Sequence, residues 1–183
     1  MSRGIVFVRL DRKSLRLLVF TDASFANNKD LSSQIGYVLV LVDKDKRANI
    51  LHWSSIKCKR VTRSVLASEL YGMAHGFDIA AAIKSTIDKV LQFDLPLVIC
   101  IDSRSLYECI VKLGTTQEKR LMIDLMCLRQ AYERREIAEV KWISGDTNPA
   151  DSMTKCKPSS ALKRLLESNT VELEVVEWVE RQI

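Results

Sequence analysis

The sequence predicts an α/β fold that opens with three antiparallel strands and continues with alternating helices and strands. Three short apolar runs near the N-terminus are separated by polar segments, which is typical of strands joined by turns. From Thr62 the apolar spacing changes to the three-and-four period of a helix packed on one face. A later apolar run, Leu97 to Ile101, has the composition of a strand buried on both faces in a parallel pairing.

Five strands are expected, at residues 15–21, 35–42, 50–56, 97–101 and 140–143. The first is rich in apolar, β-branched and aromatic side chains and stops at Asp22. The second and third are joined by a polar turn, in a hairpin-like arrangement. These features predict an antiparallel opening to the sheet.

Four helices are expected between and after these strands. The first runs from Thr62 to about Lys84, and the second covers residues 103–113. A third helix follows Thr116, which can cap it. The last begins near Asp151, two residues after Pro149.

Length and composition fit one globular domain. The chain has 183 residues, of which 47% are hydrophobic and 28% charged, a balance that excludes a disordered or membrane-spanning class. We expect one domain at residues 1–167, followed by a C-terminal tail at 168–183 whose structure the pattern leaves open. No apolar run is long enough to cross a bilayer, and the N-terminus lacks a signal-peptide pattern, so an intracellular location is expected. The five cysteines form no C-x-x-C spacing and are interpreted as reduced structural residues.

Basic residues outnumber acidic ones, with a net charge of +5 and a pI of about 9.0. This bias suits an anionic partner but does not establish one. Two short segments concentrate the positive charge: Lys57, Lys59, Arg60 and Arg63, and then Lys155, Lys157, Lys163 and Arg164. Each cluster taken alone is also compatible with an ordinary solvated surface.

Four carboxylates stand at positions where a site could form. Asp22 and Asp102 each follow an apolar strand, and ligand sites collect at the carboxyl ends of strands in α/β sheets. Glu69 lies on the apolar face of the first helix, where an ionised side chain is costly unless a positive charge meets it. Asp151 lies in the first turn of the last helix, where a negative charge is favourable in any case. If all four converge, they require a hard divalent cation, above all Mg²⁺.

Five ordered motifs resemble the ribonuclease H domain of copia-type LTR retrotransposon polyproteins. They extend from about residue 16 to residue 157: Phe20-Thr21-Asp22-Ala23-Ser24, His52-Trp53-Ser54-Ser55, Ala67-Ser68-Glu69-Leu70-Tyr71, Ile101-Asp102-Ser103-Arg104-Ser105-Leu106 and Asn148-Pro149-Ala150-Asp151-Ser152-Met153-Thr154-Lys155. Any one motif is weak, but five in order are a specific signal. The resemblance implies a ribonuclease H-like fold, with a five-stranded mixed sheet flanked by helices.

The resemblance also implies an activity, which is hydrolysis of the RNA strand of an RNA–DNA hybrid with two Mg²⁺ ions, or Mn²⁺ in their place. Asp22 and Asp151 would hold one ion, while Asp22, Glu69 and Asp102 would hold the other. Candidate substrate contacts are Ser24, Ser68 and Ser103 beside the acids, and Lys57, Arg60 and Arg63 in the basic connection. The serines are also common residues at helix starts and strand ends.

The family context implies that the reverse transcriptase portion of the same polyprotein is a partner, with a location in cytoplasmic particles, the nucleus or both. Two departures from the family pattern stand out: the first implies slow turnover, and the second implies weak hybrid binding by the isolated domain and a dependence on that partner. No histidine lies between Gly145 and Ala150, where many ribonucleases H have one in a mobile loop. Only a short connection separates the second and third expected helices, so the extra basic helix of cellular enzymes is missing.

Two other classes remain as alternatives. An inactive nucleic-acid-binding or connection module would keep the fold, but its expected mark is a missing acid, and all four acids are present. An integrase or transposase core also uses carboxylates and two metals, but usually ends with a glutamate on a long helix. In this chain the last acid is Asp151, directly after Asn148-Pro149-Ala150. Both alternatives are therefore weaker than the nuclease.

Overall fold

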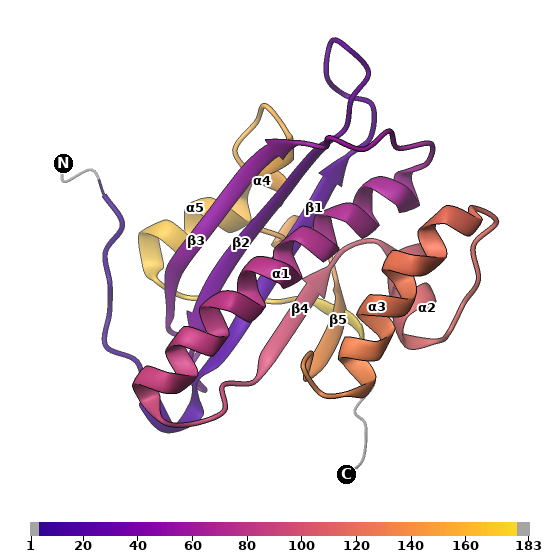
Figure 1. Ribbon diagram of the computed structural model, residues 1–183. Helices are drawn as coiled ribbons and strands as arrows, with labels where there is room; N and C mark the ends of the chain where they lie inside the picture. Colours follow the sequence, from indigo (N-terminus) through magenta and orange to yellow (C-terminus); the bar gives the residue numbers. More distant parts are fainter. Residues whose placement is uncertain (1–3, 179–183) are drawn as a thin grey trace.

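The apolar N-terminal run forms the central strand of a mixed six-stranded sheet in a computed structural model that describes residues 4–178 (Figure 1). The strand order is β3-β2-β1-β4-β5-β6. Strands β1, β2 and β3 pair antiparallel, whereas β1, β4 and β5 pair parallel. The strands are β1 (Arg16–Ser24), β2 (Gln34–Val42), β3 (Ala48–Lys57), β4 (Leu97–Ile101), β5 (Glu139–Ile143) and β6 (Val175–Trp178).

The sixth strand corrects the expected count of five. Strand β6 lies in the C-terminal segment and pairs antiparallel with β5, so that Lys141 faces Trp178. Thr170 forms a further, isolated antiparallel bridge to Arg47 in the turn between β2 and β3. Because β6 is a short edge strand whose residues are mostly exposed, it carries no clear alternation of apolar and polar side chains.

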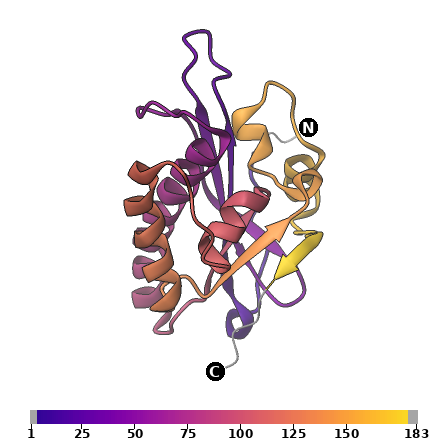
Figure 2. The same cartoon turned by 90° about the vertical axis from the view of Figure 1, so that its right-hand side faces the viewer.

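Helices cover both faces of the sheet (Figure 2). Three of them pack on one face: α1 (Val65–Leu91), α2 (Arg104–Val111) and α3 (Met122–Glu133). The other face is covered by α4 (Asp151–Thr154) and α5 (Ser160–Ser168). Short 3₁₀ turns occupy Arg12–Ser14, Lys119–Leu121 and Gly145–Thr147.

Alternate residues of the central strands supply the two cores. Leu17 and Val19 of β1 pack under α1, whereas Leu18 and Phe20 pack on the side of α5. This is the period of two that a strand buried on both faces requires. Strand β4 is buried along its whole length, as its continuous apolar run predicts.

Three helix boundaries differ from the sequence prediction. Helix α3 begins at Met122 after a 3₁₀ turn, and Thr116 does not cap it, because the Thr116 hydroxyl accepts a hydrogen bond from the Glu118 N–H in the preceding loop. Helix α1 starts after the N-cap Ser64 and continues to Leu91, beyond the expected end near Lys84, because Ile87 and Leu91 extend its apolar stripe onto the core. The single last helix is instead two helices, α4 and α5. The backbone becomes extended at Lys155, and the hydroxyl of Ser159 caps a new helix by accepting a hydrogen bond from the Leu162 N–H.

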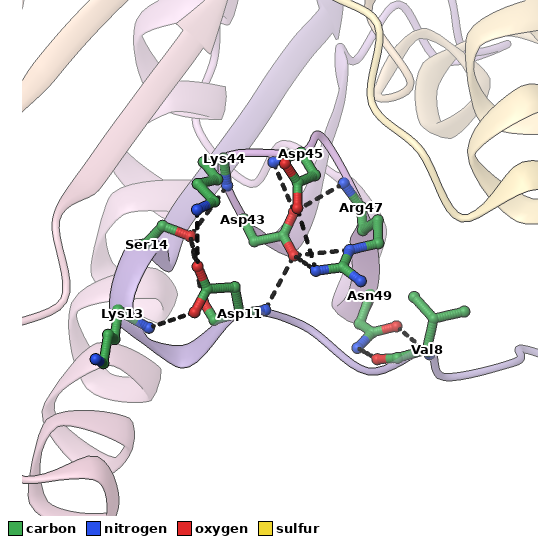
Figure 3. Close-up of polar contacts among 9 residues, drawn as sticks. All are labelled: Val8, Asp11, Lys13, Ser14, Asp43, Lys44, Asp45, Arg47 and Asn49. Carbon is green, nitrogen blue, oxygen red and sulfur yellow. Dashed lines mark hydrogen bonds and ion pairs between the residues drawn. The ribbon is translucent and has the colours of Figure 1, made fainter.

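A buried aspartate ties the N-terminal segment to the β2–β3 turn (Figure 3). The Asp43 carboxylate accepts hydrogen bonds from the backbone N–H groups of Asp11 (3.0 Å), Asp45 (3.0 Å) and Arg47 (3.1 Å), and it pairs with the Arg47 guanidinium at 2.7 Å. Asn49 adds a two-way amide pair with the backbone of Val8, at 2.8 Å in each direction. The segment before β1 therefore packs along the turn end of the β2–β3 hairpin.

In residues 4–178 no helix has the length and apolar character that a membrane span requires. The five cysteines are free. Cys58, Cys100 and Cys109 are buried, and Cys127 and Cys156 are exposed.

Candidate active site

Three carboxylates meet at one edge of the sheet. Asp22 is in β1, Glu69 is in the first turns of α1, and Asp102 directly follows β4. Each offers an oxygen that lies within 4.8 Å of those of the other two. Strands β1 and β4 are parallel neighbours, so their carboxyl ends bring two acids together, as the sequence predicts.

Close packing of α1 on β1 brings the third acid to the same place. A Cβ atom added at Gly76 would lie 2.8 Å from Thr21 Cγ2, so this helix face can approach the strand only with glycine there. Glu69 lies on the same buried face, between Ala67 and Leu70. Its position on the apolar side of the helix confirms the inward orientation expected from the sequence.

One local expectation is corrected, because Asp22 lies inside β1 rather than after it. The strand continues to Ser24, and Asp22 pairs across the sheet with Gly36 of β2. The parallel pairing with β4 ends earlier, at Phe20 and Cys100. The parallel pairing of β1 with β4 therefore ends just before the two strands reach Asp22 and Asp102.

Burial makes the three negative charges costly. Asp22 is only 4% exposed and Glu69 only 6%. Burial raises the pKa of Glu69 well above its ordinary value, and the charges of Asp102 and Asp22 raise it further. Burial, together with the charge of Asp22, raises the pKa of Asp102 to about 6. Burial also raises the pKa of Asp22, although a hydrogen bond from Thr154 opposes this effect.

The ligand set fits a hard divalent cation. All three side chains are carboxylates, and oxygen ligands of this kind are those that Mg²⁺ and Mn²⁺ prefer. A cation between them would neutralise three charges that burial makes costly and that repel one another. The residues therefore suit a metal centre better than a purely structural cluster.

Asp151 lies beside this group but is not part of it. It is the first residue of α4, and its carboxylate forms an ion pair with Lys155 one turn later. Its charge contributes to the raised pKa of Asp22, which places the two acids in the same electrostatic neighbourhood. The sequence predicted four converging acids, and the structure brings carboxylate oxygens of three of them within 4.8 Å of one another.

Three site residues were missed by reasoning from the sequence. Asn148 is fully buried and donates to the Asp102 carboxylate at 3.2 Å and to the Thr21 carbonyl at 3.0 Å. Thr154 donates to the Asp22 carboxylate, and Lys155 pairs with Asp151. All three belong to the motif around Asp151, so the motif carried the signal, but only its acid was assigned a role.

The candidate serine contacts differ in accessibility. Ser24 is half-buried at the end of β1. Ser103 caps α2, with its hydroxyl accepting a hydrogen bond from the Leu106 N–H. Ser68 has no exposed surface and donates to the Val65 carbonyl at 2.7 Å, so it is not available to a substrate. This corrects the expectation for Ser68.

The basic connection between β3 and α1 is exposed, but two of its charges are paired. Lys57 forms an ion pair with Asp30 at 2.6 Å. Arg60 pairs with Asp124 at 2.8 Å and lies over the Tyr71 ring, 4.9 Å from its centroid. Arg63 is exposed. Exposed ion pairs of this kind are weak, so an anionic ligand can replace the acidic partners.

Comparison with known proteins identifies the fold. No protein-family model and no curated protein matches the sequence. Among solved structures, RNase H1 of the archaeon Halobacterium salinarum NRC-1 is similar, with a TM-score of 0.57, 17% identity and coverage of 81% of this chain and 98% of that chain. The N-terminal RNase H domain of a Mycobacterium tuberculosis protein gives a TM-score of 0.54 at 19% identity, covering 77% of this chain and 91% of that one.

A third similar structure is LC11-RNase H1 in complex with an RNA/DNA hybrid, from a metagenome-derived protein isolated from compost. Its TM-score is 0.55 at 17% identity, and the match covers 75% of this chain and 93% of that chain. Identities this low establish the fold and nothing finer. The chain therefore has the ribonuclease H fold, which the sequence predicted.

Proposed function

We propose that this chain is a ribonuclease H, an endonuclease that hydrolyses the RNA strand of RNA–DNA hybrids with two divalent metal ions. The observation that carries the proposal is the convergence of Asp22, Glu69 and Asp102 at the carboxyl ends of adjacent parallel strands. The similarity to LC11-RNase H1, which binds an RNA/DNA hybrid, supports the substrate class.

The assignment of metal ligands follows the sequence motifs. Asp22, Glu69 and Asp102 would hold one ion, and Asp22 together with Asp151 would hold the other. Bound at these carboxylates, two Mg²⁺ or Mn²⁺ ions would supply Lewis-acid activation of water and charge stabilisation at the leaving 3′ oxygen, so the protein would need no covalent nucleophile. The products are a 5′-phosphate and a 3′-hydroxyl.

The chain's own residues orient these ligands. Asn148 and Thr154 donate hydrogen bonds to the carboxylates of Asp102 and Asp22. Lys155 holds a positive charge beside Asp151. Substrate contacts are proposed at Ser24, Ser103, Lys57, Arg60 and Arg63, all of which are at least partly exposed.

We further propose that the chain belongs to a copia-type retrotransposon polyprotein and works beside its reverse transcriptase, in cytoplasmic particles or the nucleus. The five ordered motifs support this origin. Contacts to the sugar and phosphate backbone do not specify bases, so cleavage would be nearly independent of sequence.

The test is cleavage of a labelled RNA–DNA hybrid by the purified chain with Mg²⁺ or Mn²⁺, beside Asp102→Asn. Asp45→Asn is the matched control, because it removes one negative charge from a side chain that is 58% exposed. Asp45 lies in the β2–β3 turn, at the end of the sheet away from the acids. We expect the wild type and the control to cut only the RNA strand of the hybrid, and Asp102→Asn to be inactive. Equal cleavage by Asp102→Asn, or cutting of duplex DNA and duplex RNA as well, would overturn the proposal.

A further inference from the structure

The Asp22 carboxylate is held by one side chain from α4, which packs on the face of the sheet opposite α1. Thr154, at the end of α4, is 7% exposed, and its hydroxyl donates to Oδ2 of Asp22. Among residues 4–178, no other side chain hydrogen bonds to this carboxylate. The two residues are far apart in sequence, so the contact depends on how α4 packs against the sheet.

Close packing of α4 depends on a glycine in β2. Gly36 is the residue paired with Asp22, and a Cβ atom added to it would lie 2.3 Å from Met153 Cβ and 3.0 Å from Thr154 Cγ2. Any other residue there would push α4 outward. The Ser55 hydroxyl of β3 donates to the Met153 carbonyl, which fixes the same turn from the neighbouring strand.

The hydroxyl restrains a carboxylate that would otherwise turn away. Glu69 and Asp102 both lie close to Asp22, and three like charges in a buried space repel one another. A hydrogen bond from a buried donor limits rotation of the Asp22 carboxylate and keeps it facing the other two acids. Outer-shell partners of this kind orient metal ligands, and their loss typically weakens metal binding about 10–100-fold.

We propose that Thr154 is a positioning residue for Asp22, holding its carboxylate in the orientation that a divalent cation requires, and that Gly36 provides the space for this contact. The proposal rests on the metal-dependent function proposed above and adds a residue to it. Thr154 acts through Asp22 and touches neither substrate nor metal.

The experiment compares Thr154→Val, which keeps the shape and removes the donor, with Thr154→Ser, which keeps the donor. The matched control is Thr21→Val. The Thr21 hydroxyl is buried next to Asp22 but has no hydrogen-bond partner within residues 4–178, so this substitution removes a hydroxyl without breaking a bond seen there. Mn²⁺ affinity is measured calorimetrically without nucleic acid, and circular dichroism checks that each variant is folded.

We expect Thr154→Val to bind Mn²⁺ about 10–100-fold more weakly than the wild type, whereas Thr154→Ser and Thr21→Val stay within about threefold. Hybrid cleavage should follow the same order. If Thr154→Val binds Mn²⁺ like the wild type, or if Thr154→Ser is as weak as Thr154→Val, the positioning role is refuted while the proposed nuclease stands. If the wild type binds no Mn²⁺, both proposals fail together.

Discussion

The side-chain amide of Asn148 donates a hydrogen bond to Oδ2 of Asp102 across 3.2 Å. The same Nδ2 atom donates to the backbone carbonyl of Thr21, next to Asp22, at 3.0 Å. The amide oxygen accepts from the Ala150 N–H at 3.0 Å. One buried side chain therefore links the ends of β1 and β4 to the turn that precedes α4, and so links three of the segments that carry acids.

Replacing Asn148 with alanine should destabilise the protein by about 2–4 kcal/mol, because the Thr21 carbonyl and the Ala150 N–H would be left buried without partners. Urea denaturation with circular dichroism measures the free energy of unfolding. Asn27→Ala is the control, since Asn27 is exposed in the β1–β2 loop and its loss should cost less than about 0.5 kcal/mol. A similar small cost for Asn148→Ala would contradict the bridging role.

The raised pKa of Asp102 predicts a pH-dependent stability in the protein without divalent metal. Burial and the charge of Asp22 raise this pKa from 3.8 to about 6, so the folded state holds the proton more tightly than the unfolded state. The stabilisation linked to this proton is fully present below about pH 4 and is lost as the pH rises through about 6.

Asp102→Asn removes this titration. In EDTA, the free energy of unfolding of the variant minus that of the wild type should therefore increase from pH 4 to pH 7. The gain should be on the order of 1–3 kcal/mol, as expected for a shift of about two pKa units. Chemical denaturation at a series of pH values measures the difference. A constant difference across this range would show that Asp102 titrates normally in the folded protein.

Asp43 should stabilise the fold without affecting the metal site. Asp43→Ala removes the acceptor for the Asp11, Asp45 and Arg47 N–H groups, and we expect a loss of about 2–4 kcal/mol at pH 7 (Figure 3). Asp45→Ala, at an exposed side chain of the same turn, is the control. Mn²⁺ affinity measured by calorimetry should be unchanged in folded Asp43→Ala, and a large loss would show that the two ends of the sheet are coupled.

The cost of Asp43→Ala should also depend on pH in the opposite sense to Asp102→Asn. Burial works to raise the pKa of Asp43, but the hydrogen bonds from Asp11 and Arg47 outweigh it, and the net pKa is lowered. The stabilisation is therefore present above the ordinary pKa of 3.8 and lost as the pH falls below it. Denaturation at pH 3 should show a smaller difference between Asp43→Ala and the wild type than at pH 7.

Lys155→Met should increase the stabilisation that the protein gains from Mg²⁺. The Lys155 ammonium pairs with Asp151. Its positive charge also opposes the effect of burial, which raises the pKa values of Asp22, Glu69 and Asp102. Without it the metal-free protein should be less stable, and the cation would meet no competing positive charge.

Melting temperature with and without 10 mM MgCl₂ measures this effect. A site with a Kd of about 1 mM gives about 1.4 kcal/mol at this concentration, or roughly 3–6 °C. We expect a larger rise in melting temperature for Lys155→Met than for the wild type. The control Lys157→Met, at an exposed lysine outside these contacts, should show the same rise as the wild type. A smaller rise in Lys155→Met would indicate that Lys155 supports metal binding instead.

Local patterns were sufficient for the elements that hold the site. The apolar runs at β1 and β4 and the helical stripe of α1 each depend on neighbouring residues, so their positions could be read from the sequence with errors only at the ends. The same patterns placed Asp22 and Asp102 near strand ends and Glu69 on a buried face. They did not reveal β6 or the break between α4 and α5, because a short exposed strand and a four-residue helix have too few residues to show a period.

The sequence by itself determined the order of the first five strands and of the helices among them, the ribonuclease H-like fold class and which acids to consider. Only the tertiary structure decided that Asp22, Glu69 and Asp102 form a compact group, while Asp151 pairs with Lys155. It also decided which polar side chains hydrogen bond to the acids, namely Asn148 to Asp102 and Thr154 to Asp22. The physical reason is that a hydrogen bond forms only within about 3 Å. For residues as far apart in the sequence as these pairs, that distance is set by how closely helices and loops pack on the sheet, which no local pattern records.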